Sequence, residues 1–202
     1  KLNTKTIIID IPTHKVGYST NLYNKLLSLN IDYVVSPVMG GPLQAEEGIL
    51  GAIVGCNKNK YKFAKNILLN FCKNVFYFGD TETAVKAKLI SNFLSLGTTT
   101  FVIETLKAAN KLNIDLKKIY EVAKLGSGNS VALNRIAEKA LNDDYKGYIF
   151  SVNNALKDFT YIQELLKDMP DAEKLSSVTK SFYKNAKENG YGDLLISELI
   201  KK

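Results

Sequence analysis

The chain has little of what metal sites and disulfide scaffolds require. Its 202 residues include one His, two Cys and no Trp. A single His cannot build a His-rich metal site, and Cys56 and Cys72 form no C-x-x-C pair. We therefore expect no bound metal and no disulfide framework, and the sparse cysteine favours a reducing, cytoplasmic location.

Long apolar runs are also lacking. The uncharged run at residues 34–38 is far shorter than the roughly 20 residues that cross a bilayer. The polar start at residues 1–6 is followed by only three apolar residues, which is unlike a signal peptide. From these runs we expect no transmembrane helix, no signal peptide and no membrane partner.

Charge of one sign is not concentrated anywhere. The chain carries 27 basic and 20 acidic residues, a formal charge of +7, and its lysines are scattered among acids. No nucleic-acid-binding motif is present, so we expect no nucleic-acid partner. With 46% hydrophobic and 23% charged residues, the composition is that of a globular protein.

Several catalytic signatures are missing from these residues. There is no G-x-G-x-x-G, no G-x-x-x-x-G-K-[ST] and no G-x-S-x-G. The acidic pairs at 46–47 and 143–144 are typical of solvated surface. His14 follows the end of a predicted strand, where it is either an ordinary turn histidine or a ligand contact.

The first 79 residues show the alternation of an α/β domain. Residues 6–10 predict a buried strand, 17–30 a helix and 33–38 a second strand, which together form a parallel β-α-β unit. A glycine-bearing loop at 39–48 follows. The next predicted elements are a strand at 49–55, a helix at 60–71 and a strand at 75–78. A sheet of this size is incomplete, so either the chain begins within a domain or a partner supplies the rest.

From residue 80 onward the pattern is helical throughout. Residues 83–112 sustain a 3.6-residue period for about 30 residues, which is typical of a helix around which others pack. Five further helices are predicted, at 116–124, 130–141, 152–166, 172–189 and 193–202. We therefore expect an α/β piece at 1–79 and an all-helical domain at 80–202.

Two features of the residues themselves point to chemistry. Gly40 and Gly41 follow a predicted parallel strand, where backbone N–H groups approach ligands closely. Lys88 and Asn92 lie one turn apart on the long helix and share a face. Lys88 is either a surface lysine or, if its stem is packed and desolvated, a proton donor and acceptor.

Short motifs extend these features along the chain. Near the N-terminus they are D-I-P-T, which ends at Thr13, then V-S-P-V-M-G-G at 35–41 and Q-A-E-E-G-I-L at 44–50. Further on are Gly79 with Lys88 and Asn92, G-S-G-N-S at 126–130, Phe150 with K-D at 157–158, and G-Y-G-D at 190–193. In this order they resemble the β-hydroxyacid dehydrogenase family, which includes 3-hydroxyisobutyrate dehydrogenases and glyoxylate/succinic semialdehyde reductases.

The resemblance implies a fold and an activity. The fold is the end of a Rossmann-type parallel-sheet domain followed by a 6-phosphogluconate-dehydrogenase-like helical domain, with a long interdomain helix. The activity is an NAD- or NADP-dependent hydride transfer that interconverts a small β-hydroxyacid and its aldehyde or keto form. The implied partners are a small carboxylic-acid substrate and further copies of the chain, as a dimer or tetramer.

The resemblance also assigns roles to single residues. Lys88 exchanges the hydroxyl proton, and Asn92 orients the substrate or the Lys88 ammonium. The implied substrate-binding positions also include Met39, Gly40, Gly41 and Asp158. The implied cofactor-binding residues are Thr13, Phe150 and Lys157.

The chain departs from the family pattern at several positions. Met39 and Pro12 stand where the family has serines, and Glu82 and Ala84 where it has glycines. The family's G-x-G-x-x-G half, which holds the pyrophosphate, is absent from these 202 residues. These departures favour an alternative, a non-catalytic relative that serves as an assembly or dimerisation module.

Overall fold

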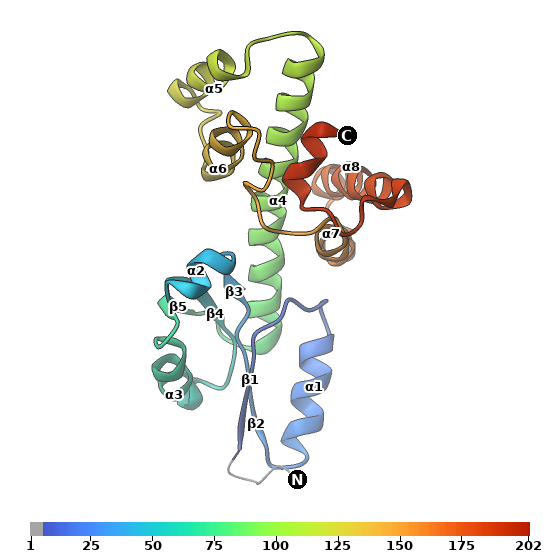
Figure 1. The fold of residues 1–202 in the computed structure, drawn as a ribbon. Coiled ribbons are helices and arrows are strands. Elements are labelled where there is room, and N and C mark those ends of the chain that lie inside the picture. Colours follow the sequence, from blue (N-terminus) through green and yellow to red (C-terminus); the bar gives the residue numbers. More distant parts are fainter. Residues whose placement is uncertain (1–5) are drawn as a thin grey trace. The chain divides into compact units, whose positions relative to one another are not determined.

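The computed structural model describes residues 6–202, and most of the polar start considered above lies outside them. The described chain divides into two compact units, one ending at Ser91 and the other running from Asn92 to Lys202. The division falls inside one long helix, α4 (Thr81–Lys111), so the first turns of this helix pack with the N-terminal unit (Figure 1).

The N-terminal unit is built on two small sheets. In the first, β1 (Ile7–Asp10) and β2 (Asp32–Val35) pair in parallel, as the β-α-β pattern predicts. In the second, β4 (Leu50–Val54) lies between β3 (Val38–Met39) and β5 (Cys72–Tyr77). The β3–β4 pair is antiparallel and the β4–β5 pair is parallel.

Pro37 explains why the predicted strand at 33–38 is two strands. Proline has no N–H to donate to a sheet and its ring restricts the preceding residue. The backbone breaks after Val35 and resumes at Val38. Val35 and Gly55 still exchange two backbone hydrogen bonds, of 3.0 and 2.9 Å, so the sheets are joined across this break.

Three helices accompany these strands. α1 (Tyr18–Leu27) packs along β2, and α3 (Lys58–Leu68) packs along β5 (Figure 1). The short α2 (Pro42–Glu46) lies where the sequence predicts a loop. Its N-terminus is formed by Pro42, whose fixed φ suits a first helical position. The loop prediction at 39–48 was therefore wrong in its second half.

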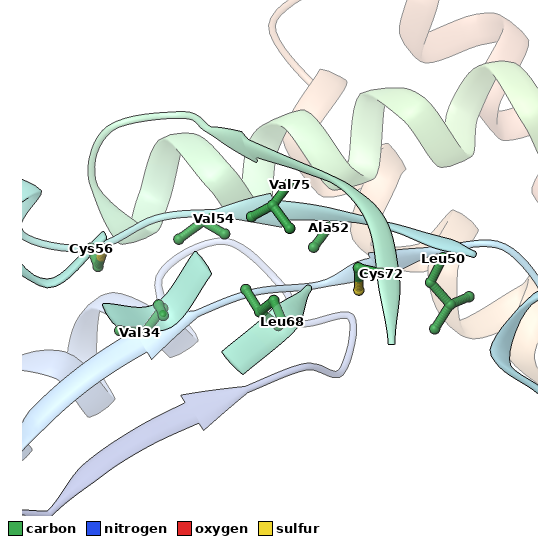
Figure 2. Close-up of a cluster of buried hydrophobic side chains, with 9 residues drawn as sticks. Val34, Leu50, Ala52, Val54, Cys56, Leu68, Cys72 and Val75 are labelled. Atoms are coloured by element: carbon green, nitrogen blue, oxygen red, sulfur yellow. The ribbon is translucent and has the colours of Figure 1, made fainter. Parts of the chain in front are cut away.

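A cluster of buried apolar side chains holds the N-terminal unit together. Val54, Ala52 and Leu68 are fully buried. Figure 2 shows β2, β4, β5 and α3 directing their side chains into this cluster. Its members are Val34, Leu50, Ala52, Val54, Cys56, Ala64, Leu68, Cys72 and Val75. Strands buried on both faces need continuous apolar runs, which is why β2 and β4 read as such in the sequence.

The C-terminal unit is helical, as predicted. Within the described residues after 81, extended pairing is limited to a single bridge between Ser151 and Leu195. After α4 come α5 (Leu116–Leu125), α6 (Val131–Ala140), α7 (Val152–Leu166) and α8 (Pro170–Ala186). A π-helical turn (Lys187–Tyr191) and a 3-10 helix (Ile196–Lys201) complete it, where the sequence predicts the end of the helix at 172–189 and a regular helix at 193–202. Gly190 has φ +84, which ends regular helix there.

The sequence analysis expects no helix long and apolar enough to span a membrane. By length and composition alone that expectation was wrong, because α4 meets both criteria. α4 contains an 18-residue window of mean hydropathy 1.2, of which 39% is buried within the protein. The core helix of a globular unit has the same length and composition. Asn92 and Thr99 of α4 are buried and donate hydrogen bonds to protein acceptors, as expected of a packed core helix.

Candidate functional site

Lys88 is buried on the first part of α4. Its side chain is 7% exposed and its neighbours Val85 and Leu89 are buried as well, so the surface-lysine alternative was wrong. Lys88 Nζ donates a 2.7 Å hydrogen bond to the Val38 carbonyl oxygen and lies 3.2 Å from Met39 Sδ. The Lys88 amine is thus removed from water and held against the end of β3. Desolvation of this kind disfavours the charged form of a lysine, which suits the residue to proton transfer.

Met39 places a thioether beside the Lys88 amine, at a position where the family pattern has a serine. Its thioether sulfur is a weak acceptor and offers no donor, whereas a serine hydroxyl offers one. The sulfur accepts from Lys88 Nζ, so this side chain contacts the candidate proton carrier directly. The structure therefore brings Met39 and Lys88 into contact, and their roles in a common site stay a prediction.

The two glycines after Met39 differ in what they offer. Gly40 has φ +117, and a Cβ there would lie 2.7 Å from a Leu50 methyl carbon, so only glycine fits. The Gly41 N–H donates a 2.8 Å hydrogen bond to Gln44 Oε1 of α2. In this structure, therefore, Gln44 occupies the Gly41 donor that was predicted to bind substrate, a capping contact that sequence reasoning missed.

A second group of predicted residues meets in the helical unit. Asn92 Nδ2 donates a 2.7 Å hydrogen bond to Asp158 Oδ2, and both residues are buried. Lys157 Nζ lies 3.1 Å from Asp158 Oδ1 as an ion pair, with the lysine side chain 42% exposed. Asp158 Oδ1 accepts no hydrogen bond from the part of the chain that the structure describes. The ion pair with Lys157 is the polar contact that the described residues give this buried oxygen.

Phe150 lies just before α7 and is fixed by its backbone. Its N–H donates to the Tyr148 carbonyl and its carbonyl accepts from the Ile196 N–H, both at 2.9 Å. The side chain is partly exposed. The bridge beside it, between Ser151 and Leu195, ties the start of α7 to the last segment of the chain.

Thr13 lies on the irregular segment between β1 and α1, partly exposed. The neighbouring His14 Nε2 makes a 2.9 Å hydrogen bond with Asp10 Oδ2, and Tyr33 OH donates to the same oxygen at 2.5 Å. Burial, and then the hydrogen bond to Asp10, raise the pKa of the Tyr33 phenol, so it stays protonated as a donor. The sequence reading treated His14 alone and missed this cluster.

Comparison with known sequences identifies the family. Residues 83–202 match the family model described as the NAD-binding domain of NADP-dependent 3-hydroxyisobutyrate dehydrogenase, and residues 1–79 match the NAD-binding domain of 6-phosphogluconate dehydrogenase. The chain belongs to the β-hydroxyacid dehydrogenase family. The cofactor class of these domains is NAD or NADP, as the resemblance implies.

Individual relatives agree with this assignment. The chain is 24% identical over 197 residues to 2-(hydroxymethyl)glutarate dehydrogenase of Eubacterium barkeri, covering 97% of this chain and 65% of that protein. It is 22% identical over 174 residues to the cytokine-like nuclear factor N-PAC of Anopheles gambiae, covering 86% of this chain and 31% of that one. The chain thus spans less than two thirds of either relative.

A solved structure supports the fold. The crystal structure of 3-hydroxyisobutyrate dehydrogenase (ygbJ) from Salmonella typhimurium superposes with a TM-score of 0.86 at 22% identity. The match covers 96% of this chain and 68% of that chain. The Rossmann-type α/β piece followed by a helical domain is therefore the fold that the sequence predicts.

Proposed function

We propose that this chain is the larger part of an NAD(P)-dependent oxidoreductase that interconverts a small β-hydroxyacid and its aldehyde or keto form. The observation that carries the proposal is the burial of Lys88 with its amine against β3, beside the glycines of the predicted substrate site. Residues 1–79 serve as the C-terminal part of the nucleotide-binding domain, and residues 80–202 as the substrate and dimerisation domain.

Lys88 is the proposed proton carrier. During oxidation its neutral amine takes the proton of the substrate hydroxyl, and during reduction its ammonium returns that proton to the carbonyl oxygen. A nicotinamide cofactor, when bound, would accept or supply the hydride. The Val38 carbonyl fixes the amine by accepting its 2.7 Å hydrogen bond, which reduces the freedom that a long lysine side chain otherwise has.

Asn92 and Asp158 are the proposed orienting pair of the helical domain. Asp158 accepts from the Asn92 amide with one oxygen, which fixes the amide and leaves Asn92 Oδ1 to accept from a substrate hydroxyl or an ammonium. The second Asp158 oxygen lies 3.1 Å from Lys157 Nζ and accepts no hydrogen bond within residues 6–202, so a ligand donor is proposed to bind it beside the lysine.

Thr13, Phe150 and Lys157 are the proposed contacts to the nicotinamide half of the cofactor. Their chemical groups suit this role. Thr13 supplies a hydroxyl at the carboxyl edge of parallel strands, Phe150 a partly exposed aromatic ring and Lys157 a partly exposed ammonium. The place of Thr13 after the parallel strand β1 and the ion pair of Lys157 with the buried Asp158 support the assignment.

The substrate carboxylate is proposed to bind at Gly40 and Gly41. Because Gln44 holds the Gly41 N–H, this requires the Gln44 side chain to swing away or to donate through its own Nε2. Met39 adds apolar surface and no donor. A substrate with a small apolar group near its carboxylate suits this wall.

Self-association is proposed through one face of α4. Leu94 and Phe101 are 73% and 72% exposed, and Leu112, the residue that follows the end of α4, continues the same helical spacing and is 68% exposed. The face from 94 to 112 carries no charge, and its six members are Leu94, Thr98, Phe101, Thr105, Ala108 and Leu112. An uncharged helix face of this length is suited to contact with a second copy.

The rival function is a non-catalytic assembly module. Met39 in place of serine, the Gln44 contact to Gly41 and the similarity to a nuclear factor favour it. The buried Lys88 and the Asn92–Asp158 pair favour the enzyme, because each keeps a polar group that is costly to bury at a position the resemblance assigns to the active site. A spectrophotometric assay of NADP⁺ and NAD⁺ reduction with 3-hydroxyisobutyrate and related hydroxyacids separates the two. Turnover supports the enzyme, and its absence in the full natural protein supports the module.

A further inference from the structure

A cluster of polar side chains lies at the carboxyl end of β1. Asp10 is the last residue of β1, and its Oδ2 accepts hydrogen bonds from two side chains, Tyr33 OH at 2.5 Å and His14 Nε2 at 2.9 Å. Tyr33 is 3% exposed and comes from the paired strand β2. A buried phenol therefore fixes the carboxylate, and the carboxylate in turn fixes the imidazole.

The arrangement decides which ring nitrogen of His14 carries the proton. An ionised carboxylate only accepts hydrogen bonds, so the nitrogen that contacts Asp10, Nε2, must be the donor. In the neutral ring this leaves Nδ1 unprotonated, as an acceptor. Nδ1 has no hydrogen-bond partner among residues 6–202, and the His14 side chain is 19% exposed. The ring is also held from one side by stacking on Tyr18, at 4.6 Å between ring centroids.

His14 is thus an oriented acceptor on the segment that carries Thr13. Ligands of open α/β sheets bind outside the carboxyl ends of the strands, which is where β1 and β2 both end. We propose that His14 Nδ1 binds the nicotinamide nucleoside half of the cofactor by accepting a hydrogen bond from it. The donor is a sugar hydroxyl or the carboxamide N–H, and it is not phosphate, which has only acceptor oxygens to offer when fully ionised.

This inference rests on the proposed function, because it uses the placement of the nicotinamide half next to Thr13. It adds a residue that none of the recognised motifs includes. The alternative is a purely structural role, in which His14 only anchors the segment at residues 11–17 through its contact with Asp10. Cofactor binding requires the His14 Nδ1 acceptor, whereas anchoring requires only the Nε2 contact with Asp10.

Nuclear magnetic resonance of the chain tests the proposal without any need for turnover. His14 is the single histidine, so its imidazole ¹⁵N signals are assigned without ambiguity. We expect the free chain to show the tautomer with the proton on Nε2. Addition of nicotinamide riboside is expected to shift both the His14 Nδ1 signal and the Thr13 backbone amide signal. Nicotinamide, ribose and inorganic phosphate are titrated in parallel.

The outcomes are distinct. If nicotinamide alone shifts Nδ1, the donor is the carboxamide; if only the riboside or ribose does, it is a sugar hydroxyl. A Thr13 shift without a His14 shift overturns the inference and leaves the proposed function standing. A His14 shift with inorganic phosphate also overturns it. If neither Thr13 nor His14 responds to the riboside, the cofactor assignment fails together with the inference.

Two variants separate binding from anchoring. In His14→Gln the amide still reaches toward Asp10 in the manner of Nε2, but the Nδ1 acceptor is lost. We expect riboside binding, read from the Thr13 amide, to weaken by about tenfold, the worth of one hydrogen bond. Lys15→Gln changes an exposed neighbour on the same segment and should bind as the parent does. Unchanged binding by His14→Gln would show that His14 is only an anchor.

Discussion

The Asn92 amide donates a 2.7 Å hydrogen bond to the Asp158 carboxylate between two helices far apart in sequence, α4 and α7. Both side chains are buried, at 7% and 1% exposure. A buried carboxylate that loses a donor keeps its full desolvation cost. This bond therefore links the stability of the helical unit to the residues of the proposed site.

Asn92→Ala is expected to destabilise the chain by about 1.5–3 kcal/mol, the usual worth of a hydrogen bond to a charged group. Asn110→Ala, on an exposed part of the same helix, should change the free energy of unfolding by no more than about 0.5 kcal/mol. Denaturant unfolding followed by circular dichroism measures both. A loss in Asn92→Ala as small as that in Asn110→Ala would show that the buried bond contributes little.

The two cysteine thiols should be protected from reaction in the folded chain. Cys56 and Cys72 are 3% and 1% exposed, and burial raises the pKa of both thiols. Since the thiolate is the reactive form, less of it exists at pH 8 than for a free cysteine. We expect slow modification by a thiol reagent, accelerated to the rate of free cysteine by denaturant. Fast reaction of either thiol without denaturant would mean that the core cluster opens readily.

The 202-residue chain alone should bind NADPH and NADH weakly. It contains no G-x-G-x-x-G segment, so the glycine loop and helix N-terminus that hold a pyrophosphate are not supplied by these residues. Calorimetric titration is expected to give a Kd well above roughly 1 μM, which means a binding free energy weaker than about −8 kcal/mol. Sub-micromolar binding would show that other groups of this chain hold the pyrophosphate.

Self-association should depend on the uncharged face of α4. A charge at Phe101 would be desolvated in a dimer contact, so Phe101→Glu is expected to shift the chain toward monomer in sedimentation. Asn110→Glu adds the same charge about 180° around the helix and should leave association unchanged. A parent chain that is already monomeric at high micromolar concentration would contradict the proposal.

Much of the fold is readable from the sequence because local periodicity determines it. The helix predicted at 152–166 has those bounds in the structure, where Val152, Phe159 and Leu166 are among its buried residues. The errors have local causes too. Pro37 splits a predicted strand because it cannot donate to a sheet, and α2 is too short, at five residues, to show a period.

The candidate site was only partly predictable. Lys88 and Asn92 are one turn apart on a helix, so the period alone places them on one face. The contact of Tyr33 with Asp10 depends on the register of β1 against β2, in which Asp10 pairs with Val35. The apolar residues of β1 and β2 follow one another without alternation, so the sequence does not specify that register and the His14 cluster has no signal in it.

The central claim is that Lys88 carries the substrate proton, and the most direct test compares two lysines of α4 in an active form of the protein. Lys88→Ala deletes a buried amine, whereas Lys86→Ala deletes an exposed one that pairs with Glu82 at 2.6 Å. The two positions differ by roughly 200° around the helix.

We predict that Lys88→Ala lowers kcat by about 100-fold or more and leaves the affinity for cofactor nearly unchanged, because positioned proton transfer contributes roughly 10²–10⁴-fold. Lys86→Ala should keep kcat within about twofold of the parent, as expected of a solvent-exposed ion pair. Steady-state kinetics of hydroxyacid oxidation, followed by NADPH or NADH absorbance, gives both values. Equal and small losses in the two variants would contradict the catalytic role of Lys88.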